Sequence, residues 1–337
     1  MTRRAPDIAA KLRPEGSPLV AGSGTTRAVS ALPGSVPEGS GYTWRDRARD
    51  YKVLVKPSIT RLVVITAAIG FALGVRSGAG WTWLMLVGTL AGTGLSCMAA
   101  SVFNQAFEWR TDAMMPRTRQ RPLAAGRLPM AEALALGGAL MLIGQAALCM
   151  FGTPLASGLA AFTILTYALV YTPLKRVSPM SLYVGAIPGA LPPLIGYTAV
   201  TGSLFTPAAA TAWAVFLIMA LWQVPHFLAI GYLYKEDYAA ADLAMHAVRD
   251  PSGKSSLRNA ILGGVLLLPA GLLPTLWGDA GWWAFGVSLI CGLLFLGLAI
   301  RWACAADSAR KAWARRVFFA SLIYLPVVLT AVMVDAR

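Results

Sequence analysis

Long apolar segments follow one another along the chain from about residue 60 to the C-terminus, and short polar or Pro- and Gly-containing stretches separate them. Several segments approach the roughly 20 residues that an α-helix needs to cross the hydrocarbon core of a bilayer. The segments lie at about 60–75, 81–103, 131–151, 155–172, 181–200, 208–230, 259–277, 281–303 and 316–334. This pattern predicts an all-α, polytopic membrane protein with about nine transmembrane helices.

Composition agrees with this interpretation. Of the 337 residues, 57% are hydrophobic and 13% are charged, and the mean hydropathy is +0.61. A soluble domain carries about 25% charged residues. The four cysteines lie in apolar segments without a CxxC pair, which argues against a disulfide framework and against a zinc site.

A net charge of +14 could indicate a protein that binds nucleic acid, but the distribution of the charge argues against this. If all nine segments cross the membrane, 27 of the 29 Lys and Arg residues fall on one side. Cytoplasmic loops carry such an excess, so the N-terminus is expected in the cytoplasm and the C-terminus outside. The basic excess is therefore an orientation signal, and nucleic acid is not expected as a partner.

Two regions of different composition divide the chain. Residues 1–42 are rich in Gly, Ser, Pro and Ala without an apolar period, and we expect a disordered N-terminal tail there. Residues 43–337 form the predicted membrane domain. The tail contains no apolar stretch of the kind that a signal peptide needs. It also lacks a convincing amphipathic helix, which favours a bacterial inner (plasma) membrane over a mitochondrial inner membrane.

Three oxygen-bearing side chains recur every four residues where the second apolar segment ends. They are Asn104, Glu108 and Asp112. On a helix this spacing stacks them along one face. Three arginines follow between two helix-breaking prolines, at positions 117, 119 and 121. Carboxylates hold a divalent cation and arginines hold phosphate oxygens, so the motif suits a magnesium-bound diphosphate. An amphipathic helix end with juxtamembrane charges is the alternative.

A second group of polar residues is expected on the same side of the membrane. The stretch Y-T-P-L-K-R at 171–176 brings Lys175, although Lys175 would equally serve as a headgroup anchor. The sixth segment ends in W-Q-V-P-H-F at 222–227, and the acidic residues Glu236, Asp237 and Asp242 follow it. A lone membrane histidine such as His226 is either a functional group or a satisfied interior hydrogen-bonding residue. The last three segments offer no catalytic candidate.

The polar groups and the apolar bundle beneath them together indicate which reaction the site would support. The sequence lacks the GxGxxG, Walker, HExxH and GxSxG motifs. Two carboxylate groups and a basic loop above an apolar bundle suit a substrate with a diphosphate head and a long hydrocarbon tail. Magnesium would neutralise the charge that grows on the leaving diphosphate. The bundle would shelter an allylic cation from water.

The three motifs resemble the protohaem IX farnesyltransferase (haem O synthase) family of the intramembrane aromatic-prenyltransferase superfamily. The resemblance rests on N-x-x-x-E-x-x-x-D-x-x-M-x-R-T-x-x-R-P-L at 104–123, Y-T-P-L-K-R at 171–176, and W-Q-x-P-H-F with E-D-Y at 222–238. It covers roughly residues 50–334. It implies nine helices around a central cavity. It also implies Mg²⁺ as the cofactor, and farnesyl diphosphate and haem B as the reactants. The implied reaction joins the farnesyl group to a haem vinyl group, giving haem O and diphosphate for terminal oxidases.

The resemblance also implies roles for particular residues. The expected metal ligands are Asn104, Glu108, Asp112 and Asp237. The resemblance leaves open which other carboxylate of the second cluster takes part. Diphosphate and substrate binding fall to Arg117, Arg121, Lys175, Tyr171, Trp222 and His226. His226 is expected near the haem, as an axial ligand or an orienting group. A haem A synthase or a terminal oxidase assembly factor is a possible partner.

Two other functions use the same features. A prenyltransferase for a hydroxybenzoate or quinone precursor needs the same diphosphate machinery, and W-Q-V-P-H-F favours haem over those acceptors. A transporter or a non-catalytic haem-handling protein would also carry intramembrane charges. The acidic residues here end helices on one face instead of lying at the bilayer midplane, which argues against transport.

Overall fold

The computed structural model describes residues 42–250 and 252–336, and the predicted N-terminal tail therefore lies almost entirely outside the described residues. The first two helices are α1 (Trp44–Val55) and α2 (Pro57–Arg76). The others are α3 (Trp83–Met114), α4 (Met130–Phe151), α5 (Pro154–Leu165), α6 (Thr172–Val177), α7 (Ser181–Ala190), α8 (Pro192–Thr201), α9 (Ala210–Leu233), α10 (Lys235–Ala240), α11 (His246–Arg249), α12 (Lys254–Leu276), α13 (Trp282–Ala303) and α14 (Asp307–Val334).

Nine helical spans in the described part of the chain are long and apolar enough to cross a membrane. This confirms the predicted all-α, polytopic fold. The first span starts at Pro57, three residues before the predicted start at about 60. Proline is well tolerated in the first turn of a helix, where its missing N–H would have no partner. The second span is longer than predicted because the helix continues through the polar motif as far as Met114.

Two of the spans are broken inside the bundle. The fourth runs from α5 through a π-helical turn at Thr166–Tyr171 into α6. The fifth is divided at Leu191 into α7 and α8, where Pro188, Pro192 and Pro193 interrupt the helical hydrogen bonds. The Gly- and Pro-rich sequence of this span accounts for the kink. Broken helices are tolerated at this depth where neighbouring helices cover the freed backbone groups.

Small residues allow the fifth span to pack closely against the first. A Cβ atom on Gly196 would lie 1.9 Å from the carbonyl oxygen of Ala67, and one on Gly70 would lie 1.8 Å from that of Pro193. No side chain fits at either position, so α2 and α8 are in backbone contact across Gly70 and Gly196. Such small-residue contacts are typical of helix association in membranes.

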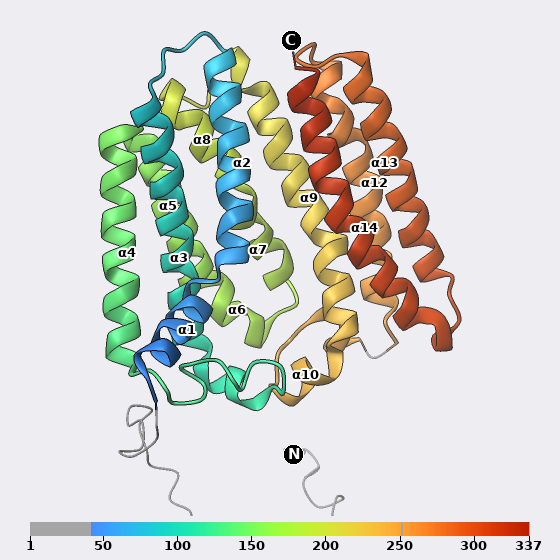
Figure 1. Cartoon of the computed structure of the whole chain (residues 1–337). Helices are drawn as coiled ribbons and strands as arrows, with labels where there is room; N and C mark the ends of the chain where they lie inside the picture. The colour runs from blue at the N-terminus through green and yellow to red at the C-terminus, as the bar shows by residue number, and fades with distance from the viewer. Residues whose placement is uncertain (1–41, 251, 337) are drawn as a thin grey trace, which may run out of the picture. The chain divides into compact units, whose positions relative to one another are not determined.

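The helices form one bundle whose two ends carry different groups (Figure 1). α3 packs against α4 and α2, while α9 packs against α12, α14 and α7. The end of α3, the loop after it, α6 and α10 all lie at the same end of the bundle, and the C-terminus lies at the other (Figure 1). The two predicted polar clusters therefore share one end of the bundle.

Candidate active site

The three oxygen-bearing residues of the first motif lie on the last turns of α3 and are buried. Asn104, Glu108 and Asp112 have exposed fractions of 2%, 8% and 1%. The helix is continuous through all three, so the four-residue spacing places them on one face, as predicted. The helix ends at Met114, two residues before Pro116, and the chain then turns into the arginine-containing loop.

Each carboxylate of this face is paired with a basic side chain from another segment. The Nζ of Lys175 on α6 donates a hydrogen bond of 2.8 Å to Oε1 of Glu108. A guanidinium nitrogen of Arg121 donates to both carboxylate oxygens of Asp112, at 2.7 and 2.8 Å. Such charge-assisted hydrogen bonds are the strong ones, and they hold the basic groups where a bound polyphosphate would need them.

Lys56 is a further basic group of the site, and the sequence analysis did not identify it. Its Nζ donates to Oδ1 of Asn104 at 3.3 Å, while Nδ2 of Asn104 donates to Oγ1 of Thr172 at 3.1 Å. Lys56 adopts a left-handed backbone conformation, with φ of 47° and ψ of 66°, between α1 and Pro57. A non-glycine residue in this region is uncommon and is strained. Burial, together with the charges of Arg121 and Lys175, lowers the pKa of Lys56 to about 8.

A cavity of about 510 Å³ leads from these ionic groups into the bundle. Volumes of 300–1,000 Å³ are typical of ligand sites. Its polar end includes Lys56, Asn104, Glu108, Asp112, Arg117, Arg121 and Lys175. Its walls come from α2, α3, α5, α7, α8 and α9, and they include Trp222 and His226. In the described part of the chain, α4 and α12–α14 contribute no lining residue, so the cavity lies within the first six spans.

An aromatic stack borders the cavity on the side of α9. The ring of His226 lies between Trp222, with ring centroids 4.8 Å apart, and Phe318, at 5.3 Å. Nδ1 of His226 lies 2.7 Å from Oγ of Ser321, and Nε1 of Trp222 donates to the backbone oxygen of Ser321 at 2.7 Å. Phe318 and Ser321 belong to α14, where the sequence offered no candidate. Only the tertiary contact with His226 identifies them.

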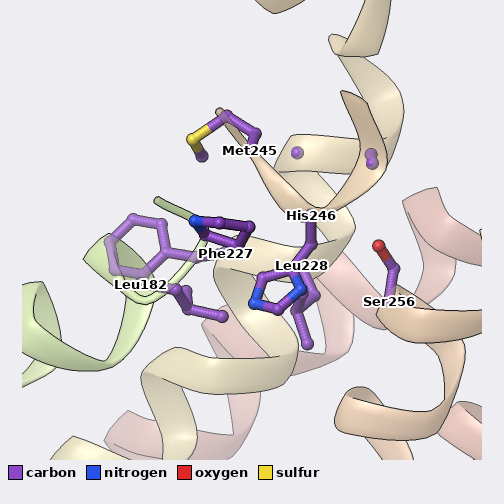
Figure 2. Close-up of a pocket in the computed structure, with 9 residues that line it drawn as sticks. Leu182, Phe227, Leu228, Met245, His246 and Ser256 are labelled. Atoms are coloured by element: carbon purple, nitrogen blue, oxygen red, sulfur yellow. The ribbon is translucent and has the colours of Figure 1, made fainter. Parts of the chain in front are cut away.

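The second histidine, His246, does not line the cavity, although the small pocket that it lines shares Leu182, Phe227 and Met245 with the cavity. His246 lines a separate pocket of about 10 Å³, together with Ser256, Leu228 and Met245 (Figure 2). Its Nδ1 is hydrogen-bonded to Oγ of Ser255 at 3.2 Å. Burial and the charge of Arg258 lower its pKa. Of the two histidines, His226 is therefore the one that reaches the cavity.

The remaining predicted site residues occupy different positions. Tyr171 lines the cavity, and its ring centroid lies 4.3 Å from Nζ of Lys175. The guanidinium of Arg117 lies over the ring of Tyr234 at 5.1 Å, which brings the arginine loop next to the end of α9. The second motif also reaches the first through a buried contact of Met115 with Leu243.

Asp237 is not among the residues that line the cavity, although its neighbour Tyr238 is. Asp237 lies on α10 and is half-buried, whereas Asp242 is exposed and has a φ of 50°. A metal-binding role for Asp237 therefore stays a prediction.

The donor set of α3 fits magnesium. No group of three or more His, Cys, Asp or Glu side chains that could hold a metal is present in residues 42–250 and 252–336. Magnesium in phosphate-handling sites typically takes one or two carboxylates, and the substrate phosphates and water complete its shell. Glu108, Asp112 and the amide oxygen of Asn104 provide such a partial set at the mouth of the cavity.

These features describe a polytopic helical membrane protein with an internal cavity that is lined by both ionic and aromatic side chains. Comparison with known proteins assigns its family. Residues 63–323 match the model of the UbiA prenyltransferase family. The chain is also 39% identical over 294 residues to the protoheme IX farnesyltransferase of Solibacter usitatus (strain Ellin6076), an alignment that covers 85% of this chain and 98% of the relative. The chain belongs to the UbiA prenyltransferase family.

Solved structures share the fold. A digeranylgeranylglyceryl phosphate synthase superposes with a TM-score of 0.71 at 19% identity, over 86% of this chain and 98% of that one. A UbiA homologue from Archaeoglobus fulgidus, bound to DMAPP and Mg²⁺, superposes with a TM-score of 0.61 at 13% identity, over 84% and 99%. At these identities the likeness establishes the fold.

Proposed function

We propose that this chain transfers a farnesyl group from farnesyl diphosphate to a vinyl group of haem B and so forms haem O and diphosphate. The observation that carries the proposal is the single cavity that joins the ionic end of α3 to Trp222 and His226 on α9. A prenyl diphosphate needs the ionic groups, its aromatic acceptor needs a surface such as Trp222 and His226, and the reaction needs both in one continuous space. The relative from Solibacter usitatus, named a protoheme IX farnesyltransferase, supports haem as the acceptor.

The ionic end would bind the diphosphate. Asn104, Glu108 and Asp112 would hold magnesium, with Asp237 as a further candidate from the second motif. When bound, magnesium supplies positive charge that stabilises the leaving diphosphate. Lys175 and Arg121, which pair with the two carboxylates in this structure, would turn to the phosphate oxygens. Arg117, at the edge of the cavity, would add a third cationic group.

The cavity walls would hold the farnesyl chain and exclude water while the reaction proceeds. The allylic C–O bond breaks and its electron pair leaves with the diphosphate. The terminal vinyl carbon of haem then bonds to the farnesyl carbon, and positive charge develops on the vinyl carbon next to the ring. A water molecule adds there and loses a proton, which gives the hydroxyethylfarnesyl group. Sheltering the cation until the acceptor is in position is the contribution of the apolar walls.

The acceptor end would hold haem against an aromatic surface. Trp222 and His226 line the cavity here, and their rings are stacked on each other. Tyr171, near Lys175, lies closer to the ionic end and would contact the first part of the farnesyl chain. The orientation with a cytoplasmic N-terminus and the bacterial inner membrane belong to the same proposal, as do a haem A synthase or oxidase assembly partner. They are supported by the charge asymmetry and the bacterial relative.

The proposal is tested with membranes that contain the expressed chain. Given haem B, farnesyl diphosphate and Mg²⁺, they are expected to form haem O, detected by chromatography and mass spectrometry. The same membranes receive 4-hydroxybenzoate in place of haem B as a competing acceptor. Prenylated benzoate without haem O would replace the proposal with a quinone-pathway prenyltransferase. Haem binding without any product would indicate a non-catalytic haem-handling protein.

A further inference from the structure

The hydroxyl of Ser321 on α14 has one hydrogen atom, and the structure shows where that hydrogen goes. Oγ of Ser321 donates to the backbone oxygen of Phe318 at 2.5 Å, one turn earlier in the same helix. Two oxygen atoms at this distance require a proton between them. A hydroxyl donates only once, so Oγ has no hydrogen left for its second partner.

That second partner is Nδ1 of His226, at 2.7 Å. Because Ser321 can only accept here, Nδ1 must carry the hydrogen and donate it. None of the ion pairs in the described residues involves His226, and aromatic rings cover both faces of its imidazole. A charged imidazolium in these surroundings would be costly, so the neutral ring is the expected form. In the neutral Nδ1–H form, Nε2 carries the free electron pair.

Nε2 of His226 differs from that of His246. Among residues 42–250 and 252–336, neither atom has a hydrogen-bond partner, yet only Nε2 of His246 is completely buried. Nε2 of His226 keeps accessible surface, and His226 lines the large cavity. An imidazole fixed at Nδ1, stacked on both faces and open at Nε2 has the form of a preorganised metal ligand.

We propose that Ser321 is a positioning residue that fixes His226 in the Nδ1–H tautomer and thereby presents its Nε2 electron pair to the cavity as the axial ligand of the haem iron. This inference rests on the proposed function, since it assigns the acceptor. Binding of the iron by Nε2 holds the porphyrin beside Trp222, in the cavity that also contains the diphosphate-binding groups, and a vinyl group must there reach the farnesyl carbon that carries the diphosphate. The backbone oxygen of Ser321 also holds Trp222, so one turn of α14 orients both aromatic residues of the acceptor end.

The experiment uses the full chain, purified in lipid nanodiscs and titrated with ferric haem B. Absorption and electron paramagnetic resonance spectra report the iron ligand, and the titration gives the affinity. The wild type is expected to show a histidine-bound iron. His226→Ala is expected to lose this signature and to regain it with added imidazole. Ser321→Ala is expected to weaken haem binding by about tenfold and to give a mixture of ligation states, as loss of a ligand-orienting hydrogen bond does.

Two further variants separate positioning from packing. Ser321→Thr keeps a hydroxyl and is expected to restore the histidine-bound spectrum. Ser288→Ala removes another fully buried serine hydroxyl, which has no partner in the described part of the chain, and is expected to match the wild type. Binding of farnesyl diphosphate with Mg²⁺ is expected to be unchanged in the three serine variants, whose side chains do not line the cavity, and this verifies that they are folded.

Three results would overturn the inference. In the first, His226→Ala keeps the wild-type haem spectrum. In the second, Ser321→Ala is indistinguishable from Ser288→Ala. Either of these, with haem O still formed by the wild type, removes the ligand assignment and leaves the proposed function intact. The third is a wild type that neither binds haem nor forms haem O, which removes both.

Discussion

Arg121 binds both carboxylate oxygens of Asp112 through a single guanidinium nitrogen, at 2.7 and 2.8 Å. Asp112 is 1% exposed and ends the oxygen-bearing face of α3, while Arg121 comes from the loop that follows. Lys175 is paired with Glu108 in a similar way, through one hydrogen bond of 2.8 Å to Oε1. In both pairs a group suited to magnesium is held beside a group suited to phosphate, so one bound metal–diphosphate would engage all four.

Replacing Asp112 is expected to abolish turnover. Asp112→Ala removes a magnesium ligand and leaves Arg121 without its partner, while the apolar spans that direct insertion are unchanged. Haem O formation is expected to fall by at least about 100-fold, in the range found when a single charge-stabilising group is removed from an active site. Asp307→Ala, which removes an exposed carboxylate paired with Arg310, is the matched control. Full activity of Asp112→Ala in inserted protein would refute the metal assignment.

Lys56 is expected to contribute to diphosphate binding. Its Nζ lies next to Asn104 at the polar end of the cavity and can donate to a phosphate oxygen. Lys56→Met keeps the length of the side chain and removes the charge. The dissociation constant of a non-hydrolysable farnesyl diphosphate analogue is expected to rise by about tenfold, or about 1.4 kcal/mol. Lys52→Met, an exposed lysine of α1, is expected to bind normally, and equal binding by both variants would exclude this role.

The sequence predicted the parts of the molecule that depend on local pattern. The nine apolar segments correspond to the nine spans of the described residues, and the four-residue spacing placed Asn104, Glu108 and Asp112 on one helix face. The contacts that complete the site are not local. Lys56 meets Asn104 across 48 residues, and Ser321 meets His226 across 95. Periodicity and composition carry no information about such pairs, because they depend on how whole helices pack.

The position of Asp237 illustrates the same limit. Its motif predicted a carboxylate at the common end of the bundle, and α10 is found there (Figure 1). Whether a side chain in a six-residue helix faces a cavity depends on the packing of the loop after it. Here Tyr238 and Leu243 line the cavity instead.

The contact between α2 and α8 is expected to tolerate no side chain at Gly196. Gly196→Ala would place a methyl group 1.9 Å from the carbonyl oxygen of Ala67, and the two helices would have to separate. Overpacking of this kind costs about 1–3 kcal/mol. Thermal unfolding in detergent, followed by tryptophan fluorescence, measures the loss. Gly138→Ala, which meets nothing within 4 Å, is expected to be as stable as the wild type or slightly more stable. Equal stability of both variants would contradict the close contact.

Acid is expected to weaken the attachment of α1 to the loop after α3. Arg127 donates two hydrogen bonds of 2.8 Å to the carboxylate of Asp50, and Tyr42 donates a third. Burial raises the pKa of Asp50, but these hydrogen bonds outweigh it and hold the pKa below its ordinary value. A depressed carboxyl pKa stabilises the fold above the unfolded-state pKa, and this stabilisation is lost as the pH falls through the folded-state value.

The stability difference between wild type and Asp50→Asn is therefore expected to be constant between about pH 5 and pH 8 and to shrink below about pH 4. Unfolding midpoints measured across this range, with the exposed Asp307→Asn as control, test the expectation. A difference that stays the same at pH 3 would show that the charge of Asp50 does not stabilise the fold.

The most direct test of the whole account locates the metal and the prenyl chain together. The purified chain is crystallised with Mn²⁺ in place of Mg²⁺ and with a non-hydrolysable farnesyl diphosphate, and anomalous scattering identifies the manganese. The account predicts manganese at the carboxylates of Glu108 and Asp112, with the diphosphate against Lys175 and Arg121 and the chain directed into the cavity toward Trp222. Manganese bound away from α3, or a farnesyl chain outside the cavity, would contradict it.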